Sequence, residues 1–194
     1  MNRILYLHGF NSSPQSYKAR LLLEHMQDAG LGDYIEIPEI PPQPADAIAL
    51  LQQRAETMQQ YGEISFAGSS LGGFYATWLA EKYASPAVLI NPAVRPHELL
   101  VKYLGTNRNY YTAESWTLDE SHIEQFRKLY IEEVTDPQRY LLLLQTGDET
   151  LDYTEAVEKY AGCHSIIEQG GSHEFDGFER YLDKVLSFCH VTHS

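Results

Sequence analysis

The fold is decided by one stretch of the chain, Ile64-Ser65-Phe66-Ala67-Gly68-Ser69-Ser70-Leu71-Gly72-Gly73. Its first four residues are an apolar, strand-like run, and the residues from Phe74 to Tyr83 have the pattern of a helix. A Gly-x-Ser-x-Gly sequence between a strand and a helix is typical of a very tight turn that exposes the serine. Glycine at both flanking positions avoids the collisions that such a turn imposes, and Gly73 allows a further close approach. The stretch therefore places Ser70 at the carboxyl edge of a sheet.

Short apolar runs alternate with helical patterns along the rest of the chain. The expected strands are Arg3–Leu7, Tyr34–Ile37, Ile64–Ala67, Ala87–Ile90, Arg139–Thr146 and His164–Glu168. The expected helices are Ser16–Gly30, Ala45–Tyr61, Phe74–Tyr83, Ser121–Glu133, Tyr153–Tyr160 and Phe175–Cys189. This alternation predicts an α/β protein with a mostly parallel sheet of about six strands, helices on both faces and right-handed crossovers.

Residues 94–138 interrupt the alternation with a stretch rich in charged and aromatic side chains. A segment of this length is too long for a plain loop, so we expect a small helical cap or lid inserted after the fourth strand. Ser121 and Glu124 match a capping box at the start of its one clear helix. The cap aromatics could line a substrate pocket or form the cap's own core. We expect residues 1–194 to form one domain with this insertion.

Composition limits the possible classes of function. The chain has 194 residues, 43% of them hydrophobic, and a mean hydropathy of −0.36, which is typical of a globular protein. Its net charge of −13 and isoelectric point near 4.9 argue against nucleic acid or an anionic membrane as a general partner. No apolar run reaches the length of a membrane span, and the start of the chain is too short an apolar run for a signal peptide. We expect a cytoplasmic protein without stable membrane insertion.

The two cysteines, Cys163 and Cys189, lack the spacing of a metal site. They could form one disulfide, but two separate thiols are expected in a reducing cytosol. We expect neither a metal nor an organic cofactor.

Three further loops should meet Ser70, because sites in a parallel sheet form at the carboxyl ends of its strands. They begin after the first strand at His8, after the strand that ends at Thr146, and after the last strand at Gly170. A serine hydroxyl needs a base to become a nucleophile, and that base needs an orienting acid. We expect His173 to be the base and Asp148 the acid.

Two other carboxylates compete for the role of the acid. Asp152 is the closer rival of Asp148, and Glu149 is a weaker one. Asp152 also suits the N-cap of the helix that follows it, and we favour that role for it.

Two backbone N–H groups should stabilise an oxyanion beside Ser70. One belongs to Leu71, directly after the nucleophile, and the other should come from the loop after the first strand, most simply from Phe10. We expect His8 to shape this loop rather than to act as a base.

These residues together resemble the α/β-hydrolase superfamily, in which the order serine, acid, histidine is typical. More narrowly, the chain resembles the small bacterial YqiA-like esterases. The stretches that carry this resemblance are Leu5–Pro14, Gly68–Ala76, Ile90–Ala93, Gly147–Glu149 and Gly170–His173. Because the predicted oxyanion loop is reached by residue 10, we expect no extra amino-terminal strands of the kind larger hydrolases have, and the loop lacks the His-Gly-Gly-Gly sequence of many lipases.

The resemblance implies a compact hydrolase with esterase activity on acyl esters or thioesters, and with Ser70 as its nucleophile. Two alternatives stay open: a long-chain acyl-CoA thioesterase, and a non-catalytic binding protein on a hydrolase scaffold. Because an acidic chain steers polyanionic CoA poorly, the thioesterase would need local cations, for which Arg95, Lys102 and Arg108 are the candidates.

Overall fold

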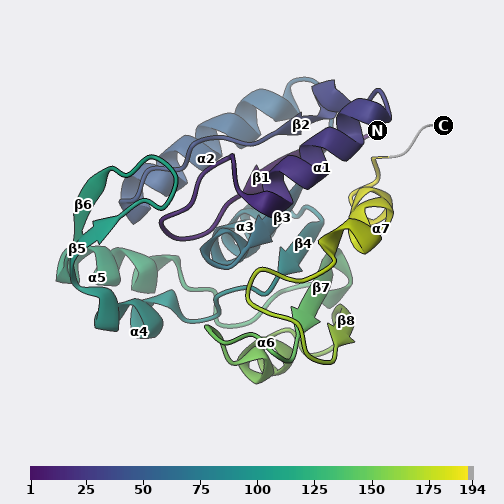
Figure 1. The fold of residues 1–194 in the computed structure, drawn as a ribbon. Helices are drawn as coiled ribbons and strands as arrows, with labels where there is room; N and C mark the ends of the chain where they lie inside the picture. Colours follow the sequence, from purple (N-terminus) through teal and green to yellow (C-terminus); the bar gives the residue numbers. More distant parts are fainter. Residues whose placement is uncertain (192–194) are drawn as a thin grey trace.

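The computed structural model describes residues 1–191, and its centre is a six-stranded parallel sheet (Figure 1). The strand order is β2-β1-β3-β4-β7-β8. The strands are β1 (Arg3–Leu7), β2 (Ile35–Glu36), β3 (Ile64–Ser69), β4 (Ala87–Ile90), β7 (Tyr140–Gln145) and β8 (His164–Glu168). The chain starts on β1, goes outward to β2 and then crosses to β3, so the carboxyl ends of β1 and β3 are neighbours.

Helices cover both faces of the sheet, as predicted. On one face lie α1 (Tyr17–Asp28) and α7 (Leu182–Phe188), and on the other lie α2 (Pro44–Gln59), α3 (Leu71–Tyr83) and α6 (Tyr153–Lys159). Successive residues of a strand point to opposite faces, so Ile4 and Tyr6 pack under α1 and α7 while Leu5 and Leu7 pack under α2 and α3. The central strands are apolar throughout because both faces are covered.

The prediction of a helix over Phe175–Cys189 is wrong at its start. Phe175 has φ 61° and Gly177 has φ 75°, and neither value fits a right-handed helix. The chain enters the helix only after Gly177, through a 3₁₀ turn at Phe178–Tyr181 that leads into α7.

The segment between β4 and β7 forms a cap that is not purely helical, which corrects the sequence prediction. It contains α4 (Pro96–Leu99), a 3₁₀ turn at Leu100–Tyr103, α5 (Glu120–Leu129) and an antiparallel hairpin of β5 (Gly105–Arg108) and β6 (Ser115–Leu118). In Figure 1 the hairpin lies beside α5, away from the sheet. Most hairpin residues are exposed, so the alternation of apolar and polar residues that would predict these strands is missing.

The predicted capping box of the cap helix is also displaced. Asp119, not Ser121, is the N-cap, and its carboxylate accepts the N–H groups of Ser121 and His122. His122 returns the bond to the backbone of Asp119, so an imidazole takes the place that a glutamate has in the usual pattern.

Two expectations from composition can be compared with the structure. Cys163 and Cys189 are free thiols. Within residues 1–191 no helix combines the length and the apolar character needed to cross a membrane.

Ser70 lies at a tight turn between β3 and α3, and the chain around it is closely packed. Its backbone has φ 54° and ψ −121°, which a residue with a side chain rarely adopts. A Cβ added to Gly72 would lie 1.9 Å from the carbonyl oxygen of Leu7, and one added to Gly68 would lie 2.3 Å from that of Gly72. These are backbone atoms that cannot move independently, so only glycine fits at both positions.

This packing makes Gly72→Ala a severe test of the turn. We expect the variant to lose about 4 kcal/mol of unfolding free energy or to fail to fold, because the clash is with backbone. Gly30→Ala is the control: its φ is +72° with no atom within 4 Å, so only the conformational cost of about 1–2 kcal/mol applies. Urea unfolding measures both. Equal losses in the two variants would contradict the steric account.

Candidate active site

The structure brings Ser70, His173 and Asp148 together at the carboxyl edge of the sheet. His173 Nε2 lies 3.1 Å from Ser70 Oγ, and His173 Nδ1 lies 2.8 Å from Asp148 Oδ2. Ser70 is partly exposed, whereas the side chain of Asp148 is only 2% exposed. An acceptor at Nδ1 keeps the proton on that nitrogen and leaves Nε2 free to take the proton of the serine. The arrangement can therefore generate a serine nucleophile.

The three candidate carboxylates have separate roles in the structure. Asp148 faces His173, and its other oxygen accepts the N–H groups of Thr150 and Leu151 at 2.9 and 2.8 Å. Asp152 instead caps α6, where its carboxylate accepts the Thr154 N–H, as the sequence suggested. Glu149 accepts the backbone N–H of His173 at 3.0 Å and so holds the histidine loop rather than the imidazole.

Sequence reasoning missed two side chains that hold the histidine loop in place. Asn91, directly after β4, donates to the carbonyl oxygens of Ser172 and His173 and accepts the N–H of Gln145. Gln145, the last residue of β7, accepts the N–H groups of Ser172 and Asp176 at 3.0 and 2.8 Å. Both residues are 2% exposed, so these bonds are shielded from water. A polar residue at the end of an apolar strand is the sequence signal that could have identified them.

Lys18 is a third residue that the sequence did not single out. Its ammonium, on α1, donates to the backbone oxygen of Glu174 at 2.8 Å and pairs with the Glu174 carboxylate at 3.1 Å. Burial lowers the pKa of Lys18, and the charge of Glu174 opposes that shift. The pair fixes the residue that follows His173, and nothing in the pattern of α1 separates this lysine from a solvated one.

The backbone beside Ser70 offers two free donors. Within residues 1–191 the N–H groups of Leu71 and Phe10 have no hydrogen-bond acceptor. Gly9 packs directly against the turn, since a Cβ at this position would lie 3.2 Å from the Ser70 Cβ. The loop after β1 therefore lies directly against the turn that carries Ser70 and Leu71.

His8 links this loop to the segment around Ile40 through hydrogen bonds. Its Nε2 accepts the Ile40 N–H at 3.1 Å, which leaves the proton on Nδ1, 3.1 Å from the Gly9 carbonyl oxygen. Burial lowers the pKa of His8 from 6.5 to about 4, against the smaller opposing effect of the Gly9 carbonyl. The imidazole is therefore neutral at pH 7 and acts as a structural bridge, in agreement with the expectation that it shapes the loop.

Asn11 ties the same loop to the cap. It has φ 53°, its side-chain oxygen accepts the Trp116 indole N–H at 2.8 Å, and its backbone oxygen accepts the Tyr110 N–H at 2.8 Å. The amide of Asn109 adds a bond to the Ser12 carbonyl at 2.7 Å. The position of the loop that carries Phe10 is thus set partly by the cap hairpin.

A cavity of about 400 Å³ opens in front of Ser70 and His173. Its walls include three cap aromatics, Tyr103, Tyr110 and Tyr111. Phe126, by contrast, is fully buried against the rings of Phe74 and Tyr75. The cap aromatics are therefore divided between two places: three tyrosines line this cavity, and Phe126 packs the cap onto α3 rather than into a core of its own.

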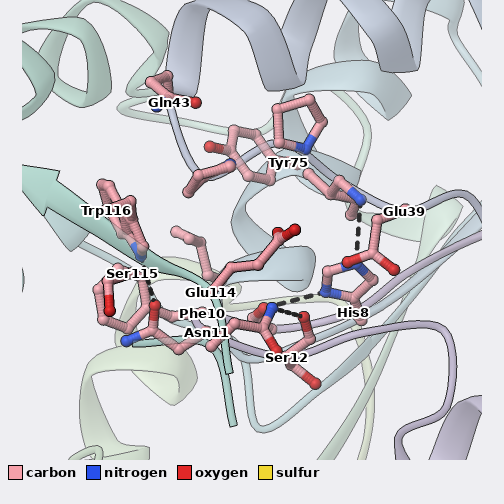
Figure 2. A pocket seen from close by; sticks show the side chains of 16 residues that line it. His8, Phe10, Asn11, Ser12, Glu39, Gln43, Tyr75, Glu114, Ser115 and Trp116 are labelled. Atoms are coloured by element: carbon pink, nitrogen blue, oxygen red, sulfur yellow. Dashed lines mark hydrogen bonds between the residues drawn. The ribbon is translucent and has the colours of Figure 1, made fainter. Parts of the chain in front are cut away.

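A second cavity of about 600 Å³ is also lined by Phe10 (Figure 2). Phe10 and Gly9 line both spaces, and Leu71 lines the second. Trp116 closes one wall and stacks edge-on against Phe10, with 5.7 Å between ring centroids. Gly9 and Phe10, in the loop after β1, therefore belong to the walls of both cavities.

The three basic residues considered for CoA do not line the cavity of Ser70. Arg95 pairs with Glu98 and Glu155 at 3.3 and 3.2 Å. Lys102 is exposed above the Tyr103 ring, and Arg108 donates to the Ala113 carbonyl. Nor does any group of three or more His, Cys, Asp or Glu side chains within residues 1–191 have an arrangement that could hold a metal ion.

Residues 3–190 match the family described as Uncharacterised protein family UPF0227. The chain belongs to this family. The match agrees with the YqiA-like resemblance of the sequence and covers nearly the whole chain.

Solved structures with the same fold are α/β-hydrolases. A protein from Agrobacterium vitis S4 described as a hydrolase superposes with a TM-score of 0.77 at 16% identity, over 97% of this chain and 88% of its own. Est1E from Butyrivibrio proteoclasticus superposes with a TM-score of 0.72 at 13% identity, over 97% of this chain and 88% of its own. A metagenome-derived lipolytic enzyme, from the report on LipS and LipT, superposes with a TM-score of 0.70 at 18% identity, over 98% of this chain and 95% of its own. At these identities the likeness establishes the fold of this UPF0227 protein.

The buried imidazole of His8 makes stability depend on pH. Its folded pKa is depressed, so between about pH 6.5 and pH 4 the unfolded chain binds a proton that the folded chain does not. We expect the unfolding free energy to fall by up to about 3 kcal/mol as the pH drops through this window. His8→Gln keeps an acceptor for Ile40 but does not titrate. In urea titrations the unfolding free energy of His8→Gln, relative to that of the wild type, should rise as the pH falls. Equal dependence of the two unfolding free energies on pH would contradict this account.

Proposed function

We propose that this protein is a serine esterase that hydrolyses small acyl esters through an acyl-enzyme on Ser70. The observation that carries the proposal is the chain of hydrogen bonds from Asp148 through His173 to Ser70, beside two backbone amides without acceptors. The esterase and lipolytic names of structural relatives support it as an analogy of fold.

The proposed reaction has two steps. His173 Nε2 takes the proton of Ser70 as Oγ attacks the ester carbonyl, and the amides of Leu71 and Phe10 stabilise the negative oxygen that forms. The imidazolium, held by Asp148, then gives its proton to the departing alcohol. In the second step His173 removes a proton from the water that attacks the acyl-enzyme, and it returns that proton to Ser70 Oγ as the acid is released. The residues need no metal or organic cofactor for these steps.

An ester fits the electrostatics of the site better than a CoA thioester. The wall in front of Ser70 carries the carboxylates of Glu149 and Glu174, and its one lysine, Lys18, is already paired with Glu174. Arg95 is likewise paired with two carboxylates. We therefore expect a simple butyryl ester to have a higher kcat/KM than butyryl-CoA, and the difference to shrink as salt screens the repulsion. A non-catalytic binding protein would have no need for the aligned hydrogen bonds of Ser70.

Substitution of Ser70 tests the reaction directly. We expect Ser70→Ala to lower the kcat for p-nitrophenyl butyrate by at least about 1,000-fold, because the covalent step is lost. Asp148→Asn should lower it by about 10³- to 10⁴-fold through the wrong imidazole tautomer. Asp152→Asn is the matched control and should change kcat only a few-fold. A folded Ser70→Ala protein with near wild-type turnover would refute the proposal.

The bond between Trp116 and Asn11 tests whether the cap positions the loop of Phe10. Trp116→Phe keeps a ring against Phe10 but leaves the side-chain oxygen of Asn11 without its donor. We expect kcat to fall by about 5- to 10-fold with a smaller change in KM, since an oxyanion donor acts mainly in the transition state. Trp78→Phe, in α3, is the control and should not change kcat. An effect on KM alone would argue against this role of the cap.

A further inference from the structure

The 600 Å³ cavity lined by Phe10 and Trp116 combines features that no step of the proposed reaction uses. It is enclosed by the loop after β1, the proline-rich segment 39–43 and the β6 end of the cap hairpin (Figure 2). Its inner wall is apolar and aromatic, with Phe10, Tyr75 and Trp116. Its polar wall carries two exposed carboxylates, Glu39 and Glu114, from opposite sides.

Charge in this cavity is of one sign. Within the described part of the chain no lysine or arginine lines it, and its histidine, His8, is neutral at pH 7 because burial lowers its pKa to about 4. Burial and the charge of Glu114 raise the pKa of Glu39, which indicates that the two carboxylates interact. In Figure 2 the side chain of Glu114 extends into the middle of the hollow. A positive charge between them would relieve the repulsion.

Tyr75 adds an independent sign of a ligand. Its side chain is 1% exposed, and its hydroxyl has no hydrogen-bond partner within residues 1–191. The rings of Phe74 and Phe126 hold it edge-on and tilted, with centroids at 5.7 and 6.2 Å. A buried hydroxyl without a partner is costly, and the cavity that Tyr75 lines is where a partner could bind.

We propose that this cavity binds a primary ammonium group carried on an apolar or aromatic body, as part of the substrate. The ammonium would donate to Glu39, Glu114 and the Tyr75 hydroxyl, and the apolar body would lie against Phe10 and Trp116, whose faces also favour a cation. Gly9 and Phe10 line both this cavity and the one in front of Ser70, so an ester that spans the two cavities would bring its carbonyl to the serine. This inference rests on the proposed esterase function and specifies its substrate class as amine-bearing esters.

Calorimetry on the Ser70→Ala protein tests the site without relying on catalysis. The probes are 4-phenylbutylammonium and its neutral counterpart 4-phenylbutan-1-ol. We expect the ammonium to bind about 5-fold or more tightly than the alcohol. The double substitution Glu39→Gln and Glu114→Gln should abolish that preference. The control, Glu63→Gln with Glu120→Gln, removes the same charge from exposed positions that do not line the cavity and should retain the preference.

Equal binding of the two probes would overturn the proposal, and so would a preference that survives in the Glu39→Gln, Glu114→Gln protein. Tyr75→Phe tests whether the hydroxyl contributes to ammonium binding independently of the stability of the fold. It should weaken ammonium binding about 5-fold without lowering the melting temperature, because the hydroxyl has no partner in the protein to lose. Unchanged ammonium affinity in Tyr75→Phe would also overturn the proposal, because the hydroxyl is one of its three acceptors. Turnover of p-nitrophenyl butyrate by the wild type reports on the esterase function separately.

Discussion

The close contact between the turn at Ser70 and the end of β1 is the constraint on which the rest of the structure depends. Gly72 lies so near the Leu7 carbonyl that no side chain fits between them. The same contact puts the loop after β1 beside the serine and forces Ser70 into a strained backbone conformation. Strain of this kind persists only where the surrounding packing determines it, and here buried strands on both sides supply that packing.

Stability and chemistry are coupled through the polar groups around the turn. Asn91 and Gln145 are buried and bonded at the ends of neighbouring strands, and together they hold the loop that carries His173. Such a network stabilises a single arrangement only while all its members are paired. Polar residues at the sheet edge therefore hold the loop of His173 in place and so set the position of the imidazole.

Much of this could be predicted from the sequence, because the signals were local. Alternating apolar strands and helices predicted the parallel sheet, and the rule that sites form at carboxyl ends of strands brought Ser70, Asp148 and His173 to one edge. The β5–β6 hairpin could not be predicted, because its residues are mostly exposed and polar. The roles of Lys18 and Asn11 depend on partners far away in the chain, Glu174 and Trp116, which no local pattern reveals.

The central claim is that His173 makes Ser70 a nucleophile, and the most direct measurement is the rate and position of labelling by a fluorophosphonate. The account predicts one covalent adduct, mapped by peptide mass spectrometry to Ser70, that forms at least about 100-fold more slowly in His173→Ala. An adduct on another residue, or a labelling rate that does not depend on His173, would contradict it.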